Sequence, residues 1–153
     1  MPVKKLKEFL DSEGIKYVTI SHSKAYTAQE VAASAHIPGK EMAKTVMVKL
    51  DGEMAMVVLP ANHKVDFDQL ADVLGVNDAD LASEEEFKGL FPDCDPGAMP
   101  PFGNLYGMDV YIEESLVDNQ RIAFNAGSHT EVIRVPFTDF ERLVNPKVFT
   151  AAS

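Results

Sequence analysis

A lysine stands on the apolar face of a predicted strand. Segment 43–50, Ala-Lys-Thr-Val-Met-Val-Lys-Leu, has the composition of a β-strand. With a period of two, Lys44 shares its face with the apolar residues Val46, Val48 and Leu50. Lysine is rarely fully buried unless it is paired or has a function, so Lys44 is a candidate for a pocket cation that binds a phosphate or polarises a carbonyl group. The alternative is a lysine whose stem packs while its ammonium reaches solvent.

A loop rich in glycine and proline follows far downstream, Gly-Ala-Met-Pro-Pro-Phe-Gly at 97–103. Gly97 permits close approach of the backbone, while Pro100 and Pro101 fix their φ angles. The remaining N–H groups of such a stiff loop are held in place, which suits an oxyanion cradle. The alternative is a surface turn stiffened for stability. Phe102 has to be buried against something, and one option is a pocket wall.

The third element is the turn Phe-Asn-Ala-Gly-Ser-His at 124–129. A histidine after a glycine at a strand end, here His129 after Gly127, can hydrogen-bond a substrate or shuttle a proton. A lone histidine can equally be structural or solvated, and Ser128 lacks the partners of a catalytic triad. No two histidines have the spacing of a helical zinc site. We therefore expect no metal and no cofactor, and a small site for an anionic or carbonyl substrate.

Length and composition favour one folded domain over residues 1–153. The chain is 46% hydrophobic and 25% charged, as is usual for a globular protein. No apolar run approaches the roughly 20 residues of a membrane span, and the basic N-terminus lacks a signal-peptide core. We expect a cytoplasmic protein without a membrane partner. The single cysteine, Cys94, excludes an internal disulfide.

The charge is strongly negative, with a formal net charge of −10. This argues against DNA and against broad, non-specific nucleic-acid binding. Between residues 24 and 64, however, lysines slightly outnumber acidic residues. Such a local patch could contact a few phosphates.

The remaining sequence predicts an α+β domain, with helices and strands interspersed. Capping boxes at 27–30, 83–86 and 138–141 predict three helix starts, and Asp66 predicts another. Asp51-Gly52 between two apolar runs predicts a hairpin. Predicted strands lie at 15–21, 43–50, 54–59, 108–112, 121–124 and 131–135. We expect a largely antiparallel or mixed sheet, curled into a barrel-like core with helices around it.

Taken in order, these strings resemble a known family. Tyr-Thr-Ala-Gln-Glu-Val-Ala at 26–32, Ala-Lys-Thr-Val at 43–46, and the two segments at 97–103 and 124–129 resemble the YbaK/prolyl-tRNA-synthetase-associated editing domains. The resemblance runs from about residue 5 to residue 146, and Gly127-Ser-His129 resembles the alanine-editing branch. It implies a barrel-like mixed sheet and an aminoacyl-tRNA deacylase that removes a wrong amino acid from the 3′ end of a tRNA.

The resemblance also assigns roles to residues. It implies that Lys44 contacts the 3′-terminal adenosine and that Thr45 lines the same pocket. The Gly97 N–H would face the scissile carbonyl, and Gly127 with His129 would seat the aminoacyl group. The other substrate-binding residues implied by the matching strings are Tyr26, Pro100, Pro101, Phe102 and Ser128.

An activated ester needs no strong nucleophile, so the implied mechanism is water attack with oxyanion stabilisation, assisted by the ribose 2′-hydroxyl. Because the resembled cysteine-editing branch lacks the histidine that corresponds to His129, the resemblance implies a small amino acid such as alanine on tRNA(Pro) and not cysteine. The bulky Pro-Pro-Phe stretch departs from some members and can reshape the amino-acid pocket. The acidic surface suits recognition limited to the tRNA acceptor end, with help from a synthetase or an elongation factor.

Two other functions remain open from the sequence. One is a non-catalytic module that binds an aminoacyl end or a nucleotide, which the absence of a catalytic acid–base pair would suit. The other is a hydrolase of small-molecule esters, which needs only the same oxyanion loop.

Overall fold

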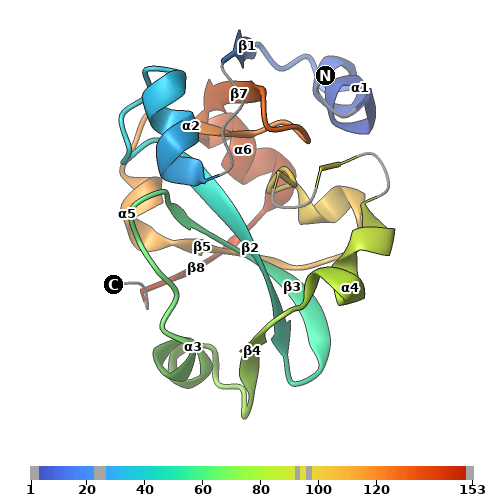
Figure 1. Ribbon diagram of the computed structural model, residues 1–153, viewed down its shortest axis with the longest axis vertical. Helices are drawn as coiled ribbons and strands as arrows, with labels where there is room; N and C mark the ends of the chain where they lie inside the picture. The colour runs from blue at the N-terminus through green and yellow to red at the C-terminus, as the bar shows by residue number, and fades with distance from the viewer. Residues whose placement is uncertain (1–3, 23–26, 92–93, 96–97, 151–153) are drawn as a thin grey trace.

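The computed structural model describes residues 4–22, 27–91, 94–95 and 98–150 and has an α+β fold with two sheets surrounded by helices (Figure 1). The helices are α1 (Lys4–Ser12), α2 (Ala28–Ser34), α3 (Phe67–Leu74), α4 (Glu84–Phe87), α5 (Glu114–Val117) and α6 (Phe137–Val144), with short 3₁₀ turns η1 (Lys88–Leu90) and η2 (Gly103–Leu105). The strands are β1 (Val18–Ser21), β2 (Ala43–Leu50), β3 (Glu53–Pro60), β4 (Ala79–Leu81), β5 (Val110–Glu113), β6 (Arg121–Asn125), β7 (Glu131–Pro136) and β8 (Lys147–Phe149). Within the described ranges, every helix is too short or too polar to cross a bilayer.

One sheet is antiparallel and the other is mixed, in agreement with the predicted largely antiparallel or mixed pairing, but the sheets do not close into a barrel. One is antiparallel with order β1-β7-β6, and the other has order β4-β2-β3-β5-β8, with parallel β3–β5 and β5–β8 pairs. Among the described residues the sheets meet at an isolated parallel bridge between Met42 and Ala123. The predicted barrel-like closure is therefore wrong. Further along, β2 pairs with β4 instead of continuing beside β6.

Local sequence signals are confirmed in most places. Asp51 and Gly52 have φ angles of 50° and 86° and connect β2 to β3 in an antiparallel hairpin. The capping box of α2 is complete, because the Glu30 N–H bonds the Thr27 hydroxyl and the Glu30 carboxylate accepts from the Thr27 N–H. The capping box predicted at 138–141 is wrong, because α6 begins at Phe137 after Pro136, which makes no side-chain cap.

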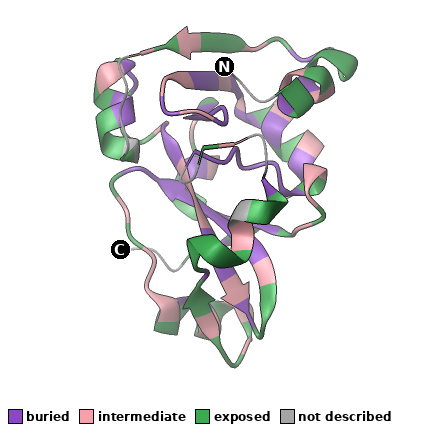
Figure 2. Ribbon diagram, turned by 45° about the vertical axis from the view of Figure 1, so that its right-hand side comes forward, coloured by how far each residue is buried: buried purple, intermediate pink, exposed green. Residues whose placement is uncertain are grey.

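Apolar packing covers both faces of β2. The largest buried cluster includes Met47 and the rings of Phe102, Phe124 and Phe140. A second cluster packs α2 against Met42, and a third packs α3 against residues of β2 and β3 such as Val48. Figure 2 shows buried residues along the central strands and exposed residues on the outer faces of the helices. A polar side chain on β2 is therefore placed between packed elements.

Candidate functional site

The loop at 98–102 and the turn at 126–129 are hydrogen-bonded to each other. The Gly127 N–H donates to the Ala98 carbonyl at 2.9 Å, and the Asp95 N–H donates to the Gly127 carbonyl at 2.8 Å. Gly127 has a φ of 96°, a conformation that favours glycine. Two segments that are far apart in the sequence are thus joined by hydrogen bonds. Gly97 itself lies outside the described residues.

Buried aromatic packing fixes this loop. Phe102 is completely buried, with ring centroids 5.3 Å from Phe124 and 5.4 Å from Phe140. Pro100 and Pro101 are also buried. The structure thus places the Phe102 ring in the core, where it anchors the loop.

The sheet face beneath α2 brings residues of four segments together. On β1, β7 and β6 the register aligns Ile20, Val132 and Asn125 in one row. The bridge between Met42 and Ala123 continues this face onto the start of β2. Lys44 and Asn125 each follow a bridge residue by two positions, so they share the face that α2 covers at Met42 and Ala123.

The pairing of β1 with β7 continues beyond this row toward the turn at 126–129. The His22 N–H donates to the Thr130 carbonyl at 2.8 Å, which extends the β1–β7 pairing by one residue. His22 directly precedes segment 23–26, so Tyr26, a predicted substrate-binding residue, lies outside the described residues.

Lys44 lies at a break in the apolar cover between α2 and α3. Met42 and Val48 on the same face are fully buried, whereas Lys44 is half-buried. Burial lowers the pKa of Lys44, and the neighbouring positive charge of Lys64 lowers that pKa further. Among the described residues, Lys44 makes no ion pair with a carboxylate. A partly desolvated cation pair of this kind favours an anionic ligand such as a phosphate.

The other predicted residues occupy two environments. Thr45 is half-buried on the opposite face of β2, which carries Ala43 and Met47 into the largest cluster. His129 is buried, with 9% of its surface exposed. The Ser128 hydroxyl lies 3.4 Å from the Thr130 hydroxyl and is half-buried. Ser128 and His129 belong to the turn, so they directly follow Gly127, which is bonded to the 98–102 loop, whereas Thr45 lies on β2.

Asn125 belongs to the predicted 124–129 turn and Lys64 to the basic segment 24–64, but neither was singled out from the sequence as a site residue. Asn125 is 7% exposed, and its Oδ1 has no hydrogen-bond partner among the described residues. The period of two along 121–125 could have placed it on the face of Ala123, but the neighbouring β2 could not be inferred. Lys64 follows β3 in a loop, and only the register of β2 with β3 brings this loop back to Lys44.

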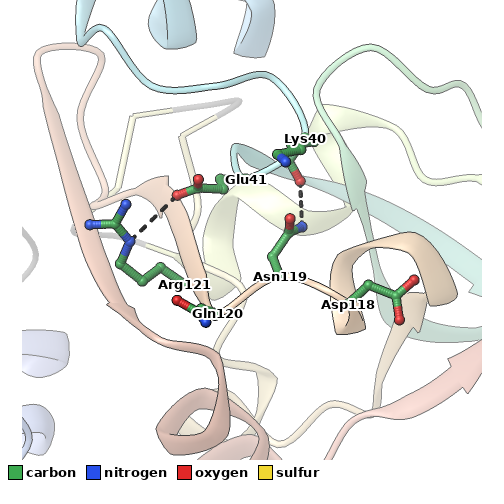
Figure 3. A pocket seen from close by; sticks show the side chains of 6 residues that line it. All are labelled: Lys40, Glu41, Asp118, Asn119, Gln120 and Arg121. Atoms are coloured by element: carbon green, nitrogen blue, oxygen red, sulfur yellow. Dashed lines mark hydrogen bonds and ion pairs between the residues drawn. The ribbon is translucent and has the colours of Figure 1, made fainter.

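A separate polar hollow of about 240 Å³ lies between the segment before β2 and the α5–β6 connection (Figure 3). Its lining residues are Lys40, Glu41, Asp118, Asn119, Gln120 and Arg121. The Asn119 side chain donates to the Lys40 carbonyl at 2.7 Å, and Arg121 Nε lies 3.8 Å from Glu41 Oε1. These contacts tie two connections together, and none of the predicted site residues lines the hollow.

No metal centre is evident within the described ranges, where no three His, Cys, Asp or Glu side chains are grouped to hold an ion. Buried Glu113 instead caps α5 by accepting the Ser115 N–H at 2.8 Å. Its Oε2 also lies 3.9 Å from His63 Nδ1. This pair is therefore best explained as a structural contact at the end of β5.

Comparison with known proteins identifies the family. A family model for the aminoacyl-tRNA editing domain matches residues 22–143. The chain belongs to this family. Among curated relatives, proline–tRNA ligase of Staphylococcus saprophyticus is 31% identical over 101 residues, which are 66% of this chain and 18% of the ligase. The ligase of Staphylococcus aureus strain Newman is 33% identical over 75 residues, 49% of this chain and 13% of that protein. The editing domain thus matches less than a fifth of either ligase.

Solved structures share the fold of this editing domain. The crystal structure of a proposed trans-editing enzyme for prolyl tRNA synthetase has a TM-score of 0.83 at 18% identity, covering 99% of this chain and 96% of the other. A hypothetical protein has a TM-score of 0.85 at 18% identity, covering 98% of this chain and all of the other. At these identities the likeness establishes the α+β fold alone.

Proposed function

We propose that residues 1–153 form a single trans-editing domain that hydrolyses the ester of a mischarged tRNA, with a small amino acid such as alanine on tRNA(Pro) as the substrate. The observation that carries this proposal is the hydrogen-bonded junction between the 98–102 loop and Gly127, and the half-buried Lys44 on β2 supports it. Membership in the editing family and the similarity to proline–tRNA ligases support it.

Lys44 binds the acceptor end of the tRNA. Its ammonium is partly desolvated and lacks a carboxylate partner among the described residues, so a phosphate near the 3′-terminal adenosine gives it the counter-charge it needs. Lys64 adds a second positive charge, near enough to lower the pKa of Lys44. This local pair also explains how a chain of net charge −10 can bind a short piece of RNA.

The loop and the turn hold the aminoacyl group. The Gly97 N–H donates to the scissile carbonyl oxygen, and Gly127 and His129 seat the amino acid. Tyr26, Thr45, Ser128 and the two loop prolines, Pro100 and Pro101, line the pocket, with Phe102 behind them. Rigid attachment of the loop to Gly127 matters because a donor aimed at the developing oxyanion is worth about 10²–10³ in rate.

Hydrolysis then needs only water. The water oxygen bonds to the ester carbonyl carbon, and the bond from that carbon to the ribose 3′-oxygen breaks. One water proton passes to the 3′-oxygen, assisted by the adjacent 2′-hydroxyl, and the other leaves as the amino acid ionises. The products are the free amino acid and tRNA with an intact 3′ end. A synthetase or an elongation factor delivers the tRNA.

Deacylation assays across a panel of aminoacylated tRNAs test this function, with Lys44→Ala as the decisive variant. Loss of a hydrogen bond to a charged group costs about 1.5–3 kcal/mol, so we expect roughly a 10- to 150-fold loss in kcat/KM. Lys49→Ala is the matched control, because Lys49 lies on the same strand but pairs with Glu86 at 2.6 Å. Full activity of Lys44→Ala would refute the site.

The same panel separates the other functions. Tight binding of every mischarged tRNA without turnover would indicate a binding module. Turnover of simple amino-acid esters, with no preference for a ribose, would indicate a small-molecule esterase.

A further inference from the structure

Asn125 presents a buried hydrogen-bond acceptor that the described part of the chain leaves unpaired. Its Oδ1 is buried and has no partner among the described residues, and the residue is only 7% exposed. Buried polar atoms in folded proteins are nearly always paired, because an unpaired one forfeits its hydrogen bonds with water. An unpaired acceptor at the end of β6 therefore indicates a donor that the described residues do not provide.

The position of Asn125 connects this acceptor to the proposed site. Asn125 ends β6, and Gly127, which bonds the Ala98 carbonyl, follows two residues later. On its other side, the parallel Met42–Ala123 bridge brings the start of β2 alongside β6. Lys44 and Asn125 then follow the bridge at equivalent positions on the same face. Asn125 thus shares the face of Lys44 beside this bridge and stands two residues before the glycine of the loop–turn junction.

The positive charge of Lys44 and Lys64 indicates which kind of donor can bind to Asn125. Burial lowers the pKa of Lys44, and the positive charge of nearby Lys64 lowers that pKa further. A third cation, such as the α-ammonium of the amino acid, would be disfavoured beside them, because a carboxamide oxygen carries no full charge to offset it. A neutral hydroxyl donates to a carboxamide without adding charge.

We propose that Asn125 positions the ribose 2′-hydroxyl of the terminal adenosine, accepting its O–H through Oδ1. This inference rests on the proposed function. A hydroxyl has one hydrogen to donate and two lone pairs that accept. With its hydrogen directed to Asn125, the 2′-oxygen directs its lone pairs toward the attacking water. Asn125 thereby orients the group that assists hydrolysis and distinguishes RNA ends from deoxy ends.

The test combines substitutions of Asn125 with removal of the 2′-hydroxyl from the substrate. Wild type, Asn125→Ala and Asn125→Asp, which keeps an acceptor oxygen, are assayed on alanyl-tRNA(Pro) ending in adenosine or in 2′-deoxyadenosine. We expect Asn125→Ala to lower kcat/KM roughly 5- to 150-fold on the ribose substrate, and to change little on the deoxy substrate. We expect Asn125→Asp to retain the preference for ribose. Asn104→Ala, at an exposed position of η2, is the control for substitution of an asparagine.

Three results would overturn the proposal. One is an equal loss on both substrates. Another is a loss that disappears only when the α-ammonium is replaced, as in a lactyl ester, because Asn125 would then bind the amino group. The third is a wild-type enzyme that does not distinguish ribose from deoxyribose.

A binding measurement keeps the inference testable if the variant misfolds or if no ester is hydrolysed. The stable amide 3′-deoxy-3′-(alanylamino)adenosine retains the 2′-hydroxyl, and its 2′-deoxy counterpart lacks it. Calorimetry with the wild-type protein should show roughly 5- to 150-fold tighter binding of the hydroxyl form. Equal affinities would overturn the role of Asn125, whereas absence of hydrolysis alone would overturn the deacylase proposal.

Discussion

Gly103 should be the least replaceable glycine among those whose surroundings the structure describes, and the reason is space. A Cβ added at this position would lie 2.6 Å from the Met108 carbonyl oxygen and 2.7 Å from Val110 Cγ2. Its φ lies outside the left-handed region, so the penalty of Gly103→Ala comes from contact and not from backbone conformation. The clash with Met108 involves backbone, which cannot rotate away.

The clash must displace a segment that other contacts hold in place. The Gly103 carbonyl accepts the N–H groups of Tyr106 and Met108, both at 2.9 Å, and the preceding Phe102 is locked among aromatic rings. Overpacking of this kind costs about 1–3 kcal/mol of unfolding free energy. For a chain of this length we expect the melting temperature to fall by about 2–12 °C. Because the loop carries the proposed oxyanion donor, a shift near 1 Å should also lower kcat about 10²-fold.

Urea unfolding, thermal melting and single-turnover deacylation measure these effects. Gly39→Ala is the matched control, because no atom lies within 4 Å of its added Cβ and its φ is also outside the left-handed region. It should keep full activity and change stability by less than about 1 kcal/mol. If Gly103→Ala is as stable as wild type, the steric argument is wrong. If it is destabilised but the folded fraction hydrolyses at the normal rate, the loop does not position the reaction.

Two further predictions concern ionisation. The pKa of Glu86 is lowered to about 2, first by Lys49 and then by the N–H and hydroxyl of Ser83, so its stabilising contribution is present above its usual pKa and is lost as pH falls toward 2. Glu86→Gln should therefore lose less stability than wild type between pH 4.5 and 2 in urea unfolding, and an equal loss would contradict this. The pKa of Lys44 is lowered in the folded protein, so the folded protein binds the proton of this ammonium less tightly than the unfolded chain does. The free energy of unfolding therefore rises as the pH increases through that lowered pKa. Lys44→Met should thus be at least as stable as wild type at pH 7 in thermal melting while losing deacylation, and a less stable variant would show that the ammonium supports the fold.

Short-range signals explain the confirmed sequence predictions. Asp51-Gly52 requires left-handed backbone angles, and Thr27 with Glu30 completes a cap within one helical turn. Each depends on residues at most a few positions apart, so the sequence contains all the necessary information. The cap predicted at 138–141 failed because Pro136, with its fixed φ, lets α6 begin at Phe137.

Long-range pairing explains what could not be predicted. The barrel-like closure failed because the far end of β2 pairs with β4, a three-residue strand with too weak a pattern to recognise. The role of Asn125 could not be predicted either, because an unpaired amide oxygen indicates a ligand only when packing buries it away from water. Asn125 is 7% exposed in the folded chain, a property that its sequence neighbours do not determine.

The sequence by itself determined the hairpin, most helix starts, the α+β class and the family, because these rest on local preferences and on motifs that keep their order along the chain. Only the tertiary structure decided that the 98–102 loop is bonded to Gly127, and that Lys44 lies near Lys64 and shares a face with Asn125. Those relations depend on strand register and on the burial of Phe102. Both are set by the free energy of packing the whole chain, which no single segment encodes.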